Sequence, residues 1–192
     1  MMKKNKIIRL WDILLSLTGI VGLFPILLII FALNSLGKGS SLFKQKRLGM
    51  DLKKFTLYKF RTMTESTIDL PTHLVDPMRI TKFGSFLRNT KIDELPQLWN
   101  VLIGDMSMVG PRPCLPQQYE LISERIKRDI FSHRPGITGL AQINSIDMSD
   151  PKKLAEIDSQ MLNKFSTRAY FIFILKTLFG KGYGDKVRKT KI

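Results

Sequence analysis

The stretch TKIDELPQLWNVL, residues 90–102, decides how this chain is organised. It opens with two adjacent carboxylates, Asp93 and Glu94. Pro96 is tolerated only in the first turn of a helix, so we expect a helix to begin here. Its apolar side chains recur at the spacing of one buried helix face: Leu95, Leu98, Trp99 and Leu102.

The position of the acid pair at a helix start has two interpretations. Thr90, three residues before Asp93, resembles the start of a capping box, and acids in a first turn are common helix caps. The unpaired N–H groups and the positive end of the helix dipole would also keep at least one acid ionised. A nucleophile or a metal ligand needs that charge, so this stretch alone leaves capping and catalysis open.

Composition narrows the class of partner. The 192 residues include 31 Lys and Arg against 16 Asp and Glu, a formal charge of +15. Such an excess predicts an anionic partner: nucleic acid, an anionic membrane surface or phosphorylated substrates. The single cysteine, Cys114, excludes an internal disulfide, and with His73 and His133 it forms no zinc-binding spacing. The sequence also lacks a Walker A loop, a GxSxG motif and a dinucleotide fingerprint.

Residues 13–33, ILLSLTGIVGLFPILLIIFAL, carry no charge and approach the ~20 residues that a helix needs to cross a bilayer. The long apolar run without a small-residue cleavage site argues against a signal peptide. Its length without a polar face argues against a buried helix of a soluble protein. We therefore expect this segment to lie in a membrane.

Two features favour a re-entrant helix-break-helix over a simple span. Pro25, preceded by Gly19 and Gly22, predicts a kink or a break. Both flanks are basic, and the positive-inside rule places such flanks on the cytoplasmic side. A simple span stays open, because spanning helices also tolerate proline. The flanking cations are Lys3, Lys4, Lys6 and Arg9 on one side, and Lys38, Lys44, Lys46 and Arg47 on the other.

The rest of the chain predicts an α/β fold that is mostly helical. Apolar runs and turn residues predict strands and loops: a hairpin over 41–47 and 54–63, a strand over 105–109, and loops over 65–77 and 134–139. Helical periodicity predicts helices over 81–90, 117–133 (exposed), 151–164 and 168–179 (on the membrane surface or packed on the apolar N-terminal segment). We expect three parts: a re-entrant membrane anchor over 1–38, a cytoplasmic catalytic domain over 39–180 and a basic tail over 181–192.

Several cations suit a phosphate site. Strand alternation in FTLYKFRT, residues 55–62, puts Lys59 and Arg61 on one face, although a solvated strand face is the commoner explanation. Prolines on both sides of Arg112 stiffen its backbone, and Arg is suited to bidentate phosphate binding. Glycines in the loop 134–139 would let backbone N–H groups approach a ligand.

These residues together permit phosphoryl chemistry. A carboxylate attacks a phosphoryl centre when a divalent ion and cations neutralise the leaving phosphate. Mg²⁺ is the natural ion, because it prefers one or two carboxylates together with substrate phosphates. The residues alone indicate a membrane-surface enzyme of phosphorylated compounds. The alternatives are a Mg²⁺-dependent phosphohydrolase, or a non-enzymatic basic membrane protein that binds anionic lipid or nucleic acid. The aromatics follow apolar periodicity instead of an exposed stacking series, so we expect no nucleic-acid partner.

Four stretches, in order, resemble the catalytic domain of the small monotopic phosphoglycosyl transferases, the bacterial sugar transferase family. They are GSSLFKQKRLG, FTLYKFRTM, TKIDELPQLWNVLIGDMSMVGPRP and RPGITGLAQIN. The resemblance implies a re-entrant membrane helix, amphipathic surface helices and a compact α/β active site on the cytoplasmic face of the bacterial inner membrane. Phe24 departs from the serine that the family often has before the membrane proline. Beyond Asn144 the chain also departs from the family pattern, so no site is carried over there.

The resemblance also implies a reaction. The family moves a sugar 1-phosphate from a UDP-sugar to undecaprenyl phosphate and releases UMP, which initiates a lipid-linked glycan such as O-antigen, capsule or a glycoprotein glycan. By this resemblance Asp93 is the nucleophile that forms a covalent phosphosugar intermediate, and Glu94 assists it, either in support of the metal site or as a base toward the lipid phosphate. Mg²⁺ would bridge Asp93 and the diphosphate. The matching cations that would hold phosphates are Lys59, Arg88 and Arg112.

Overall fold

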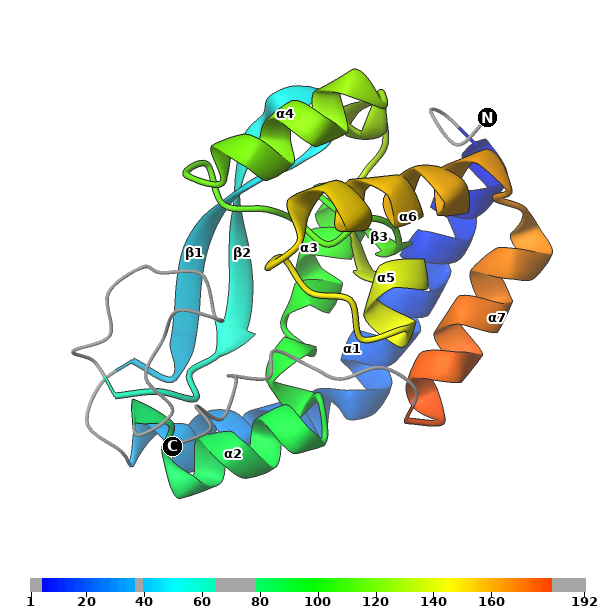
Figure 1. Cartoon of the computed structure of the whole chain (residues 1–192). Coiled ribbons are helices and arrows are strands. Elements are labelled where there is room, and N and C mark those ends of the chain that lie inside the picture. Colours follow the sequence, from blue (N-terminus) through cyan, green and yellow to red (C-terminus); the bar gives the residue numbers. More distant parts are fainter. Residues whose placement is uncertain (1–4, 37–39, 65–78, 181–192) are drawn as a thin grey trace.

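The computed structural model describes residues 5–36, 40–64 and 79–180, and Figure 1 shows their arrangement. Helices dominate this part of the chain, and the strands form two separate two-stranded sheets. The predicted α/β class with mostly helical content is therefore confirmed. Several predictions concern residues outside the described ranges: the loop over 65–77, the basic tail, His73, and the flanking cations Lys3, Lys4 and Lys38.

The predicted hairpin is confirmed. β1 (Leu42–Leu48) and β2 (Lys54–Phe60) pair in antiparallel fashion along their whole length. A 3₁₀ turn, η1 (Met50–Leu52), connects them. Alternation along β2 buries one of its faces, which carries Phe55, Leu57 and Lys59.

α2 (Lys82–Asn89) is the helix that the sequence predicts over 81–90. Thr81 Oγ1 caps it by accepting a hydrogen bond from Gly84 N at 2.8 Å. A Cβ atom on Gly84 would lie 2.1 Å from Thr62 O, so only glycine fits this position. This close contact holds α2 against the end of β2.

The C-terminal half contains a parallel pair of short strands among helices (Figure 1). β3 (Ser107–Val109) confirms the strand predicted over 105–109. β4 (Gly136–Thr138) lies in a segment predicted to be a loop, and that prediction is wrong. Three residues are too few to show a strand period, and pairing with β3 sets their conformation. The helical elements are α4 (Tyr119–Lys127), η5 (Ile130–Ser132), α5 (Leu140–Ile143), α6 (Pro151–Asn163) and α7 (Thr167–Leu178).

α4 confirms the helical part of the prediction for 117–133 but not its exposure. Leu121 is 1% exposed and Arg125 2% exposed, because this face of α4 packs against α6. Leu121 belongs to the largest core cluster, which also contains Leu154 of α6 and Tyr170 of α7. The exposed polar residues of α4 therefore lie on its outer face, and its inner face is buried.

The apolar N-terminal segment lies within one long helix, α1 (Lys6–Ser35), which by length and composition could cross a membrane. Pro25 lies inside it and has no N–H to donate to the carbonyl of Val21, a common cause of kinks. Figure 1 shows that α1 changes direction roughly halfway along its length. The predicted kink is confirmed, but the predicted break is a bend within an uninterrupted helix.

The first half of α1 is tied to the rest of the protein by Asp12, which is 2% exposed. Its carboxylate accepts hydrogen bonds from Ser107 Oγ at 2.9 Å, Met108 N at 2.9 Å and Tyr170 OH at 2.8 Å. Burial and the Asp12 carboxylate raise the pKa of the Tyr170 phenol, which keeps this hydroxyl a donor. Asp12 therefore joins α1, β3 and α7 at one point.

The second half of α1 contacts the hairpin and α2. Ile30 is buried in a cluster with Phe60 and Leu87. Near the end of the helix, Asn34 Nδ2 donates to Arg61 O at 2.9 Å and to Ser41 O at 3.0 Å. Both halves of α1 are thus packed on the same folded body.

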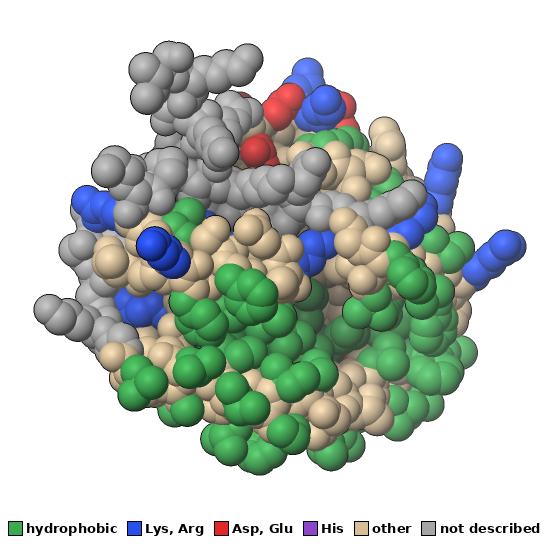
Figure 2. All heavy atoms as spheres, turned by 90° about the horizontal axis from the view of Figure 1, so that it is seen from below, with side chains coloured by type: hydrophobic (Ala, Val, Ile, Leu, Met, Phe, Trp, Pro, Cys, Tyr) green, Lys and Arg blue, Asp and Glu red, His purple; other side chains and the backbone are tan. Residues whose placement is uncertain are grey.

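Hydrophobic side chains cover much of one face of the molecule, and Lys and Arg side chains lie at its margin (Figure 2). Trp99, predicted to be buried, is 51% exposed. The buried face of α3 (Gln97–Ile103) is instead centred on Leu98 and Val101. An apolar surface of this extent is typical of a membrane or protein contact. The large exposed apolar residues include Val21, Phe31, Phe86, Trp99, Ile103, Leu178 and Phe179.

Replacing Asp12 by Ala should destabilise the protein by about 3 kcal/mol, because three buried donors lose their acceptor. The melting temperature of the detergent-solubilised protein should then fall by roughly 6–12 °C. Thr18→Ala is the control on the same helix, since Thr18 is exposed and its hydroxyl bonds only to carbonyls of α1. Equal melting temperatures for the two variants would contradict this role of Asp12.

Candidate active site

The acid pair lies in η4 (Ile92–Glu94), a single 3₁₀ turn between α2 and α3. Asp93 is 4% exposed and Glu94 is 7% exposed. The helix predicted over 90–102 begins later, as α3. Thr90 instead ends α2, where its hydroxyl donates to two carbonyls of that helix. The capping-box prediction is therefore wrong, and both acids lie ahead of α3 rather than in its first turn.

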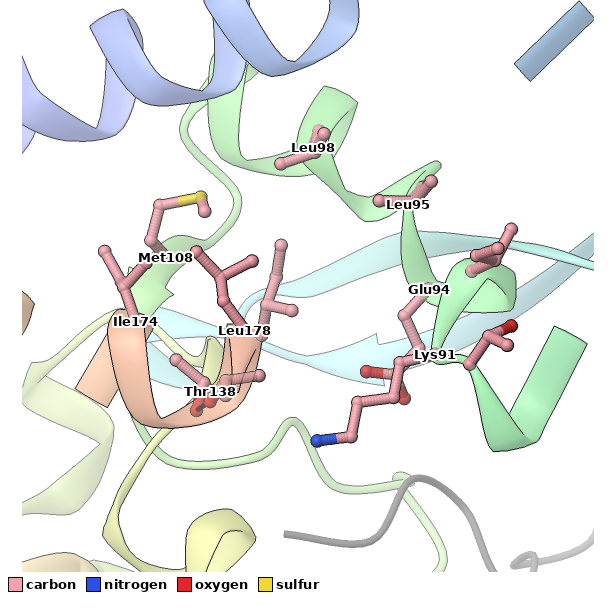
Figure 3. Close-up of a pocket in the computed structure, with 12 residues that line it drawn as sticks. Lys91, Glu94, Leu95, Leu98, Met108, Thr138, Ile174 and Leu178 are labelled. Atoms are coloured by element: carbon pink, nitrogen blue, oxygen red, sulfur yellow. Dashed lines mark hydrogen bonds between the residues drawn. The ribbon is translucent and has the colours of Figure 1, made fainter. Parts of the chain in front are cut away.

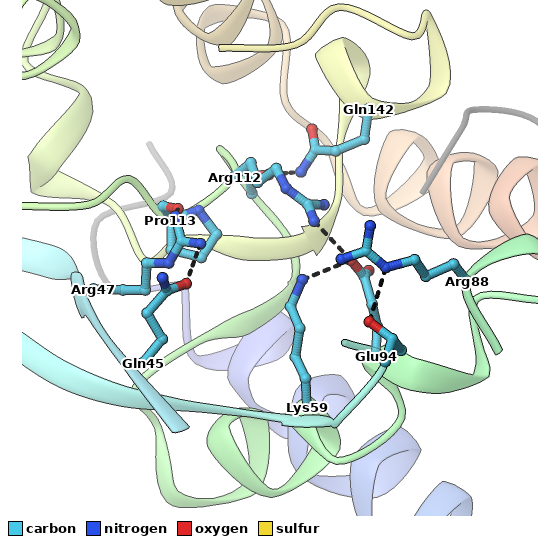
Figure 4. A network of polar contacts seen from close by, with 10 residues as sticks. Gln45, Arg47, Lys59, Arg88, Glu94, Arg112, Pro113 and Gln142 are labelled. Carbon is cyan, nitrogen blue, oxygen red and sulfur yellow. Dashed lines mark hydrogen bonds and ion pairs between the residues drawn. The ribbon is translucent and has the colours of Figure 1, made fainter. Parts of the chain in front are cut away.

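Glu94 is the anionic centre of a cluster of cations (Figure 4). Its Oε1 atom accepts from Arg112 Nη2 at 2.7 Å and from Lys59 Nζ at 3.2 Å. The side chains of Lys59 and Glu94 are each only 9% exposed. The solvated-face explanation for Lys59 is therefore wrong, because β2 turns this side chain inward to the acid pair.

Arg88 approaches the same cluster from α2. Its Nε donates to Thr62 Oγ1 at 2.9 Å, and Figure 4 shows its guanidinium beside Lys59 and Glu94. Arg61 does not join them, since its Nε donates to Ser40 O at 2.7 Å. The structure thus brings together the cations that the sequence predicts as phosphate contacts: Lys59, Arg88 and Arg112.

The loop that carries Arg112 is fixed by hydrogen bonds to every backbone carbonyl from Gly110 to Cys114. Such bonds, added to the two prolines, leave little freedom to the loop that presents Arg112. Gly110 also donates its N–H to Thr138 O at 2.8 Å. The donors to the successive carbonyls are Gln142 Nε2, Gly136 N, Arg125 Nη1, Arg47 Nη1 and Leu48 N.

Arg125 is a positioning residue that sequence reasoning missed. Its Nη1 donates to Arg112 O at 2.8 Å, and its Nη2 donates to Asp158 Oδ2 at 2.6 Å. Asp158 is fully buried. The spacing of the sequence could have indicated this burial, because Arg125 follows the core residue Leu121 by four positions and so lies on the same helix face.

Lys91 precedes the acid pair in the left-handed region, with φ 60°. This conformation, uncommon for a residue with a side chain, ends α2 and starts η4. Burial lowers the pKa of the Lys91 amine; the Glu94 carboxylate opposes this shift and the Arg112 guanidinium adds to it. Lys91 is therefore a further cation beside the site, and the sequence analysis did not single it out.

A buried carboxylate pair, one member of which binds two cations on fixed elements, lies in a molecule that also exposes a broad apolar face. This arrangement suits a membrane-associated protein that binds phosphorylated compounds.

A model of the family described as "Bacterial sugar transferase" matches residues 3–181, so the chain belongs to that family. The prediction from the four sequence stretches is confirmed, and so is the predicted class of enzyme: the family is one of sugar transferases, and several relatives are named as sugar-phosphate transferases.

A UDP-glucose:undecaprenyl-phosphate glucose-1-phosphate transferase of Klebsiella pneumoniae is 45% identical over 188 residues, which cover 93% of this chain. An Escherichia coli protein of the same name is 36% identical over 190 residues. The "Uncharacterized sugar transferase EpsL" of Bacillus subtilis is 42% identical over 163 residues, 82% of this chain and 78% of that protein. The chain spans only 40% of the length of the Klebsiella and Escherichia proteins.

Replacing Arg125 by Met should cost about 3–5 kcal/mol of unfolding free energy, because it leaves the Asp158 carboxylate buried without its cation. The double variant Arg125→Met/Asp158→Leu should recover most of this loss, since an apolar pair replaces a buried ion pair. Denaturant unfolding in detergent measures both. Arg128→Met is the control: its partners Glu124 and Glu156 are 16% and 47% exposed and so keep contact with water, and the cost should stay below about 1 kcal/mol. A double variant no more stable than the single one would rule out this account.

Proposed function

We propose that this chain transfers a sugar 1-phosphate from a UDP-sugar to undecaprenyl phosphate and releases UMP. The observation that carries the proposal is the buried pair Asp93 and Glu94, with Lys59 and Arg112 bound to Glu94. The names of the Klebsiella and Escherichia relatives support the substrate classes. The product would be the first lipid-linked intermediate of a bacterial glycan, such as O-antigen, capsule or a glycoprotein glycan.

In the first step, a carboxylate oxygen of Asp93 attacks the phosphorus that bears the sugar. A bond forms between this oxygen and the phosphorus, and the bond from the phosphorus to the bridging oxygen breaks. UMP departs with that electron pair and leaves a phosphosugar on Asp93. The nucleophile must be charged, and its neighbour in the chain, Glu94, binds the cations Lys59 and Arg112.

In the second step, a phosphate oxygen of the lipid attacks the same phosphorus. The bond to Asp93 breaks, and the carboxylate is regenerated. Because the two steps share one nucleophile, the hydrophilic donor and the lipid acceptor need not occupy the site together. This order suits an enzyme whose substrates reach the site from water and from the membrane.

The cations supply the electrostatic part of catalysis. Lys59, Arg88 and Arg112 would bind phosphate oxygens of the donor and stabilise the charge on the departing UMP. Glu94, which already binds Lys59 and Arg112, would hold these two side chains at the separation that the phosphates require. Its role is then to position cations as well as to assist Asp93.

Mg²⁺ fits the donor set of this site. Among the described residues, no three His, Cys, Asp or Glu side chains cluster as a cage for a metal ion. Mg²⁺ does not need such a cage, since it commonly takes one or two carboxylates together with substrate phosphates. Asp93, with Glu94 in support, would hold the ion, and when bound it neutralises charge on the diphosphate.

We also propose that α1 is a re-entrant anchor, with both termini and the catalytic domain on the cytoplasmic face of the bacterial inner membrane. The bend in α1 supports this topology (Figure 1). So do the contacts of Asp12 and Asn34, which attach both halves of the helix to one folded body. A straight span would carry one end of α1 away from that body.

Asp93→Asn should abolish lipid-dependent UMP release, with a loss of roughly a thousandfold or more, because the amide cannot act as the nucleophile. UDP-glucose and UDP-galactose are the first donors to test, since relatives are named for transfer of both sugars. Asp51→Asn, the same change in the exposed hairpin turn, is the matched control. UMP release by Asp93→Asn at the wild-type rate would refute the proposed nucleophile. The covalent step releases at most one UMP per enzyme without lipid, so continued UMP release by the wild type without lipid would indicate a phosphohydrolase instead.

The topology can be tested by labelling introduced cysteines in sealed vesicles, in a Cys114→Ala background. Lys6→Cys and Leu36→Cys place exposed thiols at the two ends of α1. A membrane-impermeant maleimide should label both from the same side. Labelling from opposite sides would establish a span and overturn the re-entrant anchor.

A further inference from the structure

A cavity of about 230 Å³ lies directly beside the acid pair. η4 and α3 form one wall, and β4 and α7 form the other (Figure 3). Typical pockets for whole small-molecule ligands are larger, roughly 300–1,000 Å³. The cavity therefore accommodates only part of a long ligand. The residues that define it best are Lys91, Glu94, Leu98, Met108, Ile174 and Leu178.

The two ends of the cavity differ in chemistry. Lys91 and Glu94 lie at one end, and Met108 and Ile174 lie at the other (Figure 3). The walls are otherwise mostly aliphatic, and the three threonines that line them are engaged within the protein: Thr138 and Thr177 bond to each other, and Thr90 donates to carbonyls of α2. Such walls would leave the hydroxyl groups of a sugar without hydrogen-bond partners, at a cost of about 1–3 kcal/mol for each group. The cavity is therefore unsuited to the sugar nucleotide and suited to an apolar chain that ends in an anion.

The cavity also reaches the apolar face of the molecule. Leu178 lines it and is 75% exposed, so the cavity opens where this side chain meets the surface. Leu98 lines the opposite wall and lies against α1, where a Cβ on Gly19 would be 3.1 Å from its Cδ1. Leu178 and Phe179 are exposed apolar side chains at this end of α7, so an apolar chain that leaves the cavity here meets apolar surface.

We propose that this cavity holds the first isoprene units of the lipid acceptor, with the acceptor phosphate bound by Lys91 next to Glu94. This assignment rests on the proposed function and adds to it the place where the second substrate binds. The remaining chain passes Leu178 into the membrane. The acceptor phosphate then lies beside the acid pair, next to Glu94.

A pair of substitutions on α7 tests the apolar part. Ile174→Trp fills the cavity, whereas Leu175→Trp adds the same ring at the next position, which is 51% exposed and does not line the cavity. The Michaelis constant for undecaprenyl phosphate should rise about tenfold or more in Ile174→Trp and change little in Leu175→Trp. The constant for the UDP-sugar should stay unchanged in both. Equal effects of the two variants, or an equal rise for the donor, would overturn the proposal.

Substitutions of Lys91 test the polar end of the cavity. Lys91→Met keeps the length of the side chain and removes its charge, so the Michaelis constant for the acceptor should rise about tenfold, and Lys91→Arg should restore much of it. Loss of donor use with unchanged acceptor use would contradict the assignment.

Photocrosslinking needs no catalysis, so it tests the acceptor site independently of the proposed reaction. An isoprenyl phosphate that carries a photoreactive group on its first isoprene unit should crosslink to α7 or α3, and also in Asp93→Asn. Ile174→Trp should lose this crosslink and Leu175→Trp should keep it. Crosslinks confined to other elements would refute the cavity as the acceptor site, even for an enzyme that releases UMP as proposed.

Discussion

The ion pairs of Glu94 are the constraint on which the rest of the structure depends. Two cations from distant segments, Lys59 and Arg112, meet one carboxylate oxygen in a place with little water. Charges buried in this way are tolerated only as a complete set, because removing one partner leaves the other desolvated and unpaired. The hairpin, η4 and the loop after β3 must therefore reach their final positions together. A phosphorylated ligand that enters this set meets cations already arranged, and so avoids part of the cost of ordering them.

The scaffold around this cluster explains why the cations keep their places. Arg112 lies on a loop in which each carbonyl from Gly110 to Cys114 accepts a hydrogen bond. Arg125 connects this loop to the core, because it donates to Arg112 O and also to the buried Asp158 carboxylate. Lys59 is held by the pleat of β2, and Arg88 by its bond to Thr62. Positioning of this kind matters because electrostatic stabilisation depends on charges that need not move during the reaction.

Local patterns predicted much of this fold, and long-range contacts account for what they missed. Apolar runs around a turn predicted the hairpin, and helical periodicity predicted α2. The burial of Lys59 was not predictable, because it depends on a carboxylate 35 positions away. Trp99 has the spacing of a core residue, yet it faces outward, since apolar periodicity does not distinguish a protein core from a membrane surface. The residues of the candidate site were predicted from sequence motifs: Asp93 and Glu94 as an adjacent pair, and Arg112 between two prolines. Arg125 required knowledge of how α4 packs on α6.

The attachment of α1 at both of its halves has a consequence for how the protein forms. Asp12 supplies the acceptor that β3 and α7 share, and Ile30 completes the cluster at Phe60 and Leu87. The helix is thus a core element on one side and an exposed apolar element on the other. For the membrane anchor proposed above, neither water nor lipid alone would satisfy both sides, so folding of the body and insertion into the bilayer would be coupled. The thickness and composition of the bilayer would then affect the stability of the protein.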